Sequence, residues 1–157
     1  MTEEQKKANE LVNQANQLHS QKKYEEAITA YQKAIELFPQ YKVYKFVIGQ
    51  MLLTLKRPVE AAQAYRETIA VIPDHEQAWS DLGQCLMLTG ELEAAAEAFD
   101  KAISIADTYD EPHYYGAMVQ VRLQNNKKAR AYLKRALLLR PEWKPYAKKN
   151  PLLKRFC

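Results

Sequence analysis

Apolar residues along the chain recur at helical spacing, most clearly in residues 78–102. Trp79, Leu82 and Leu86 lie at i, i+3 and i+7, which places them on one stripe of a helix. The Thr-Gly pair at residues 89–90 then breaks this pattern. This part of the chain is therefore predicted to begin with an amphipathic helix that ends near residue 90.

A second apolar stripe follows the break. Ala95, Phe99 and Ala102 mark it, and acidic residues such as Glu97 are left for the outward face. Small residues on both stripes allow the two helix backbones to approach closely, while the large side chains fill the remaining space. The pattern predicts a hairpin of two antiparallel helices.

The same residue classes recur every 34 positions. Four columns have this spacing: Ala27, Ala61, Ala95 and Ala129; Tyr31, Tyr65, Phe99 and Leu133; Ala34, Thr68, Ala102 and Ala136; and Ala15, Gly49, Gly83 and Ala117. Prolines end three of the second helices, at Pro39, Pro73 and Pro141. A fixed period of this length is typical of an array of stacked hairpins, in which each unit buries its apolar face against its neighbours.

On these residues the chain resembles the tetratricopeptide repeat family, whose pattern has Trp, Leu-Gly and Tyr on one helix, then Ala, Phe, Ala and a closing Pro. Four units match this pattern: residues 8–41, 42–75, 76–109 and 110–143. The resemblance implies an all-α fold, a right-handed α-solenoid of stacked antiparallel helical hairpins, within a single domain spanning residues 1–157.

Residues 144–157 follow the last unit and are expected to form a capping segment and a basic tail. Three residues are expected to make a short helix that caps the last hairpin: Trp143, Tyr146 and Ala147. Three further apolar residues are expected to lie on the basic tail: Leu152, Leu153 and Phe156.

No arrangement of residues typical of a catalytic, cofactor or metal site is present. The three histidines, His19, His75 and His113, occupy different places within their repeats, and there is no H-x-x-x-H, C-x-x-C or H-E-x-x-H motif. Glycine-rich phosphate loops and G-x-S-x-G motifs are also missing. We therefore expect a protein that is not an enzyme and that binds no cofactor.

The cysteines and the N-terminus favour a cytoplasmic location. Cys85 falls on the buried side of a predicted helix, and Cys157 is the last residue, which is not the paired pattern of a secreted scaffold. The N-terminal residues are polar and contain no apolar signal core.

The resemblance also implies a binding surface, because in this family the first helices line a concave groove with repeat positions two, five, nine and twelve. The corresponding residues are Asn9, Val12, Asn16, His19, Val43, Phe46, Gln50, Leu53, Gln77, Ser80, Gln84, Met87, Glu111, Tyr114, Met118 and Val121. The set has one formal charge and combines amides with apolar side chains. It predicts a scaffold or adaptor that binds a neutral, partly apolar peptide or helix of another protein, rather than a small-molecule substrate. For each residue, packing against a neighbouring unit or the C-terminal segment is the alternative.

The carboxylate clamp of heat-shock co-chaperones, a well-defined groove of this family, does not fit the sequence. Counted from the first unit, the clamp positions hold Val12, Asn16, Val47, Gln77 and Asp81; counted from the second, they hold Phe46, Gln50, Asp81, Glu111 and Tyr115. Asn16 is the one match, and Asp81 would repel a carboxylate.

Two other functions remain as alternatives. The middle of the chain is similar to the type III secretion chaperones that shield translocator proteins, although the hydrophobic N-terminal helix of that class is missing. Charge suggests the second alternative, since residues 127–157 have a net charge of +10 and the preceding residues a net charge of −6. This basic region is predicted to be a solubilising cap, with binding to nucleic acid or an anionic membrane as the less favoured interpretation. The oligomeric state, including a homo-oligomer, is left open.

Overall fold

The computed structural model describes residues 1–157, which form α-helices and short 3-10 helices with no strand. The chain divides into two compact units, an N-terminal unit of residues 1–73 and a C-terminal unit of residues 74–157. The elements of the N-terminal unit are α1 (Glu3–Ser20), α2 (Tyr24–Leu37), η1 (Pro39–Tyr44), α3 (Lys45–Thr54) and α4 (Pro58–Val71). Those of the C-terminal unit are α5 (Glu76–Thr89), α6 (Leu92–Ile105), α7 (Asp110–Arg122), α8 (Asn126–Leu139), η2 (Pro141–Trp143), α9 (Lys144–Lys149) and η3 (Lys154–Phe156).

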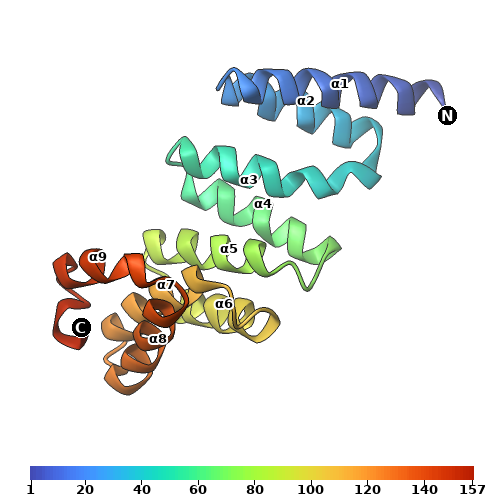
Figure 1. Ribbon diagram of the computed structural model, residues 1–157. Helices are drawn as coiled ribbons and strands as arrows, with labels where there is room; N and C mark the ends of the chain where they lie inside the picture. Colours follow the sequence, from blue (N-terminus) through green and yellow to red (C-terminus); the bar gives the residue numbers. More distant parts are fainter. The chain divides into compact units, whose positions relative to one another are not determined.

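Each unit contains two helical hairpins, as Figure 1 shows. In the N-terminal unit α1 packs against α2 and α3 against α4, while α2 also contacts α3 and η1. In the C-terminal unit α5 packs against α6 and α7 against α8, while α6 contacts α7. The all-α fold of stacked helical hairpins predicted from the sequence is confirmed.

The first helix of the second repeat is shorter than its counterparts. Residues 39–44 form the 3-10 helix η1, with Pro39 at its start, and α3 begins only at Lys45. Val43, predicted to lie on a first helix facing the groove, therefore lies in η1 instead.

In the second and third hairpins, a glycine of the first helix lies against an aromatic ring of the second. A Cβ atom added to Gly49 would be 2.7 Å from the Tyr65 ring, and one added to Gly83 would be 2.8 Å from the Phe99 ring. Both rings are fully buried. The small-residue column of the sequence thus leaves the space that the aromatic column fills.

The turn inside each hairpin requires a left-handed backbone conformation at the same repeat position. Lys22, Lys56, Gly90 and Gln124 have φ values of 61°, 60°, 88° and 61°, and they are 34 residues apart. Gly90 ends α5 as its left-handed C-cap, which confirms the predicted break at residues 89–90.

The C-terminal segment is folded against the last hairpin. The predicted capping helix is present as α9, and Ala147 and Leu153 are fully buried in a cluster with Ala117 and Leu133. The prediction that Leu153 lies on a tail is therefore wrong. Burial of its side chain is favourable because the outer face of α7 and α8 would otherwise expose apolar surface to water.

Leu152 and Phe156, which were also assigned to the tail, pack against the same cluster. The chain returns toward α7 at Asn150. The backbone carbonyl of Asn150 accepts a hydrogen bond from the Leu153 amide at 3.1 Å, and its side-chain oxygen accepts one from the Leu152 amide at 2.9 Å. The turn directs Leu153 inward, so that residues 150–156 extend the core of the C-terminal unit. None of the helices in the chain is both long enough and apolar enough to cross a lipid bilayer.

Candidate functional site

The predicted binding residues of α1 include two asparagines whose side chains are held in place. The Tyr31 hydroxyl donates to Asn16 Oδ1 at 2.5 Å, and the Tyr41 hydroxyl donates to Asn9 Oδ1. Burial raises the pKa of Tyr31, and the nearby Tyr44 adds to this effect, so the hydroxyl keeps its proton at neutral pH. Because the oxygen of Asn16 is engaged and the residue is exposed, its NH2 group is oriented to donate to a ligand.

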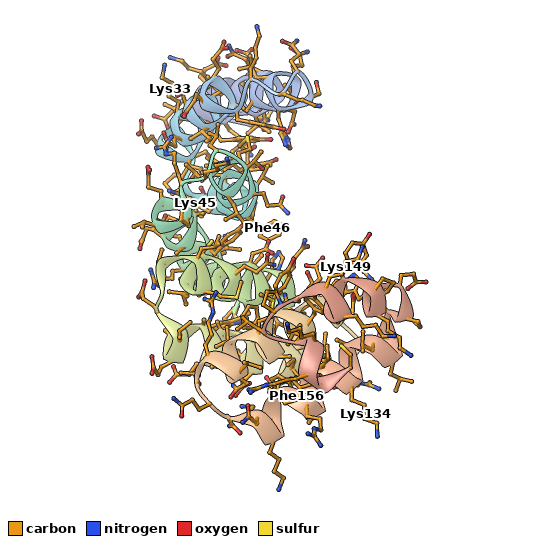
Figure 2. All side chains as sticks on the ribbon, turned by 90° about the vertical axis from the view of Figure 1, so that its left-hand side faces the viewer. Lys33, Lys45, Phe46, Lys134, Lys149 and Phe156 are labelled. Carbon is orange, nitrogen blue, oxygen red and sulfur yellow. The ribbon has the colours of Figure 1, made fainter.

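Three predicted residues form an uncharged stripe on α3. Phe46, Gln50 and Leu53 lie at i, i+4 and i+7, and each is partly exposed. Ile48 and Met51, which point to the other side of the helix, are buried. In Figure 2, Phe46 lies on one side of the N-terminal unit and the labelled lysines of that unit lie on the other.

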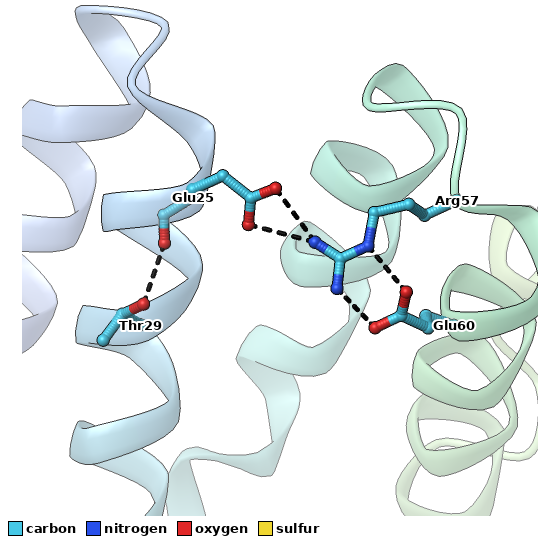
Figure 3. Close-up of polar contacts among 4 residues, drawn as sticks. All are labelled: Glu25, Thr29, Arg57 and Glu60. Atoms are coloured by element: carbon cyan, nitrogen blue, oxygen red, sulfur yellow. Dashed lines mark hydrogen bonds and ion pairs between the residues drawn. The ribbon is translucent and has the colours of Figure 1, made fainter.

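Charged side chains of the N-terminal unit pair with one another away from this stripe. Arg57 bridges two second helices, because its Nη1 lies 2.9 Å from Glu25 Oε1 on α2 and its Nε donates to Glu60 Oε1 on α4 at 2.6 Å (Figure 3). The hydrogen bonds from Arg57 lower the pKa of Glu60. Lys45 on α3 pairs with Glu67 on α4 at 3.0 Å. The pairing leaves the α3 stripe without a charge.

In the C-terminal unit, α5 presents a comparable row of amide and apolar side chains, with the buried carboxylate of Asp81 behind it. Gln77 is exposed, and Gln84 and Met87 are partly exposed. Gln84 Nε2 donates to Asp81 Oδ1 at a long distance of 3.4 Å, which leaves its amide oxygen as an acceptor.

Two predicted binding residues are buried and cannot line a groove. Val12 is 6% exposed and lies with Ala8 and Ala15 on the interior side of α1, while Ser80 has no exposed surface. The prediction that these two residues line the groove is wrong, because both side chains point into the interior between packed helices instead of toward solvent.

His19 and Val43, at the edges of the predicted set, keep some exposed surface. The His19 ring packs against Tyr24 with a centroid distance of 5.8 Å. Neither residue joins the α3 stripe.

On α7 the C-terminal segment covers much of the predicted surface. Tyr114, Met118 and Val121 pack against the cluster that contains Ala147 and Leu153. These three side chains therefore pack against the C-terminal segment, which was the alternative to lining a groove, although each remains partly exposed.

The packing leaves a pocket at the edge of the C-terminal segment. Its volume is about 330 Å³, and its walls are the aromatic rings of Tyr114, Tyr115, Trp143 and Tyr146. Of these, only Tyr114 belongs to the set predicted from the sequence. Tyr115 is one of the clamp positions counted from the second unit, while Trp143 and Tyr146 were expected to form the capping helix.

Glu111 lies on α7 beside this pocket. The Tyr109 hydroxyl donates to Glu111 Oε2 at 2.9 Å. Burial raises the pKa of Tyr115, and the negative charge of Glu111 raises it further. The carboxylate is thus close enough to act on the aromatic residues around it.

Several basic residues of the C-terminal region are engaged within the C-terminal unit. Lys128 pairs with Asp100, Arg135 with Asp107, and Arg140 with Asp110. Two more, Arg130 and Arg155, stack on the Phe156 ring at 5.9 Å and 4.7 Å from its centroid. Part of the positive charge is therefore used to hold the last hairpin and the C-terminal segment together.

No three His, Cys, Asp or Glu side chains lie close enough together to hold a metal ion. Cys85 is fully buried and forms no disulfide, as expected of a small core residue.

Comparison with known families gives three matches along the chain. Models described as tetratricopeptide repeat match residues 8–41, 52–121 and 117–142. No curated protein sequence matches the chain significantly.

Solved structures of low sequence identity share the fold. A crystal structure of MamA protein superposes with a TM-score of 0.87 at 17% identity, covering 96% of this chain and 82% of that one. The structure of MamA 41-end from Desulfovibrio magneticus RS-1 gives 0.78 at 22% identity, covering 87% and 77%. The first TPR of Spaghetti (RPAP3), bound to the HSP90 peptide SRMEEVD, gives 0.69 at 22% identity, covering 76% and 94%.

Proposed function

Because the chain belongs to the tetratricopeptide repeat family, whose members generally mediate protein–protein interactions, we propose that it is a scaffold or adaptor that binds a neutral, partly apolar peptide of a partner protein. The exposed stripe of α3 provides the contacts in the N-terminal unit, and α5 presents a comparable surface in the C-terminal unit. Asn16 on α1 adds a backbone-binding amide.

The observation that carries the proposal is the uncharged stripe of Phe46, Gln50 and Leu53 on α3. It offers two apolar contacts on either side of an amide, and the charged residues of the same unit pair elsewhere. Side chains of this kind suit an extended peptide, since Gln hydrogen-bonds its backbone and the apolar groups bury its side chains. On α5, Gln84 and Met87 offer the same combination.

The structural neighbour RPAP3 binds SRMEEVD, a peptide with three acidic residues. The surface charge of this chain favours a different kind of ligand. The stripes of α3 and α5 contain no Lys or Arg that would pair with such a peptide. A ligand of low charge avoids the cost of burying an unpaired carboxylate there.

The test is selection of peptides from a displayed random library on the whole chain, followed by calorimetric titration of the selected peptides. Phe46→Ala on α3 and Met87→Glu on α5, made separately and together, test the surface of each unit. The double variant is expected to bind at least about tenfold more weakly, because central apolar contacts dominate peptide affinity. The matched controls are Val59→Ala and Leu88→Glu, since both residues are highly exposed on the same two units but outside the stripes.

Helicity measured by circular dichroism should be the same in all variants. Selected peptides that are acidic, or that bind the double variant as tightly as the native chain, would contradict the proposal.

A further inference from the structure

The aromatic pocket of the C-terminal unit has walls that meet at steep angles. The Tyr114 and Tyr115 rings are inclined by 86° with centroids 5.6 Å apart, and the Tyr114 and Trp143 rings by 72° with centroids 4.3 Å apart. Tyr115 and Trp143 are inclined by 62° at 6.3 Å. Rings arranged in this way present faces and edges in several directions, and with Tyr146 they line an open hollow of about 330 Å³.

A negative charge lies at the edge of this pocket. Glu111 precedes Tyr114 by three residues and Tyr115 by four, so the three side chains share one face of α7. Glu111 forms no ion pair, and its one hydrogen-bond donor is the neutral Tyr109 hydroxyl. The carboxylate therefore keeps its charge available to a ligand.

Aromatic faces and a carboxylate together attract a cation. The face of a Trp or Tyr ring carries negative electrostatic potential, which binds ammonium and guanidinium groups within about 6 Å of the ring centroid. Trp143 already attracts such a group, because the Arg140 guanidinium lies 5.0 Å from its centroid. Arg140 does not line the pocket, and its own charge is paired with Asp110 at 2.6 Å.

Other positive charges lie near the pocket, on α9 and at Arg140. The lysines of α9, at residues 144, 148 and 149, are exposed, so water and salt screen them. Glu111 is partly buried beside the rings, where its field is screened less.

We propose that the pocket of Tyr114, Tyr115, Trp143 and Tyr146, together with Glu111, binds a basic side chain, arginine or lysine, of the partner peptide. This inference rests on the proposed peptide-binding function and specifies one residue of the ligand. This basic residue is the one charge of an otherwise neutral peptide, and it pairs with Glu111, the one acidic residue of the predicted surface.

The test uses N-acetyl-arginine amide as probe, with its neutral isostere N-acetyl-citrulline amide and with N-acetyl-proline amide as comparisons. Binding to the whole chain is followed by the NMR shift of the Trp143 indole N–H. The arginine probe is expected to bind at least about threefold more tightly than the citrulline probe, and added salt should reduce the difference.

Two variants and a control locate the site. Glu111→Gln keeps an acceptor for Tyr109 but removes the charge, and it should weaken the arginine probe about three- to tenfold without affecting the citrulline probe. Tyr146→Ala removes an exposed wall that the fold does not need, and it should weaken the arginine probe as well. Glu97→Gln, an exposed acid on α6, should change nothing.

Equal binding of the arginine and citrulline probes, tighter binding of the proline probe, or an unchanged Glu111→Gln variant would overturn the inference. Failure of the two proposals can be told apart. If selected peptides bind normally while the probe does not, only the pocket is wrong; if the probe binds while no peptide is selected, the peptide-binding function is wrong and the pocket stands alone.

Discussion

Individual residues are matched across the two helices of each hairpin. Gly49 faces Tyr65 and Gly83 faces Phe99, so each glycine is required because its partner is a large ring. Where the second helix has Leu133 in that column, the first helix has Ala117 instead of glycine, and both are buried. In the first hairpin the same columns hold Ala15 and Tyr31, both buried, so the fit is particular to each hairpin.

Gly83→Ala is expected to lower the free energy of unfolding by about 1–3 kcal/mol, because the added methyl group overlaps the Phe99 ring in a packed core. Urea denaturation followed by circular dichroism measures this change. In an exposed helix the same substitution would stabilise the protein by roughly 0.5–1 kcal/mol. An increase in stability would therefore show that the close contact is not present.

A second residue-scale expectation concerns Glu60, whose pKa is lowered chiefly by hydrogen bonds from Arg57. Because the folded-state pKa is below the ordinary value of 4.5, the interaction stabilises the fold above that pH and is lost as pH falls through the lower pKa. In Arg57→Gln the pKa should rise toward 4.5, as measured by NMR titration of the side-chain carboxyl carbon.

Lys56→Gln, which removes a neighbouring exposed charge without touching Glu60, is the control and should leave the titration nearly unchanged. An equal rise in both variants would mean that general charge, and not the Arg57 hydrogen bonds, lowers the pKa. The group is fully exposed, so the effect on overall stability is small.

At the scale of elements, the regular helices were predictable and the irregular ones were not. The 34-residue period predicts the hairpins, and each of the four repeat units contains the two helices that it implies. A 3-10 helix begins at Pro39 and another at Pro141, but only a turn is present at the equivalent residues 73–74 and 107–108, so periodicity could not reveal it. Leu153 was assigned to a tail for the same reason, because residues 144–157 have no repeat partner and their burial depends on the turn at Asn150.

The candidate site was predictable only in part. Repeat positions place Phe46, Gln50 and Leu53 on the exposed side of α3, but they also include Val12 and Ser80, which are buried. At the boundary between the buried and exposed faces of a helix, a side chain is buried or exposed according to what packs beside it. The repeat spacing alone does not show which of the two occurs. The aromatic pocket combines α7 with residues beyond the last repeat, so only the folded chain brings it together.

Leu153→Ala is expected to lower the free energy of unfolding by about 2–4 kcal/mol, because it leaves a cavity in the cluster that joins the C-terminal segment to α7 and α8. Leu138→Ala on α8 is the matched control, since Leu138 is 69% exposed and its truncation should cost less than about 0.5 kcal/mol. Equal midpoints of urea denaturation for the two variants would mean that the segment is not part of the core.

At the scale of the whole molecule, charged and uncharged surfaces serve different purposes. Ion pairs such as Arg57 with Glu25 join neighbouring hairpins, and part of the basic C-terminal region pairs with acidic residues of the same unit. The exposed stripes of the first helices are left for a partner. Each compact unit contributes such a stripe, on α3 in one and on α5 in the other.

The most direct measurement is an NMR titration of the whole chain, labelled at its Leu and Met methyl groups, with a peptide obtained by the selection described above. The proposed function predicts that Leu53 shifts with the dissociation constant of the peptide, while Leu88 and Leu138, which are more exposed but lie outside the stripes, do not. Shifts confined to Leu88 and Leu138, or no shift at Leu53 when the peptide is fully bound, would contradict it.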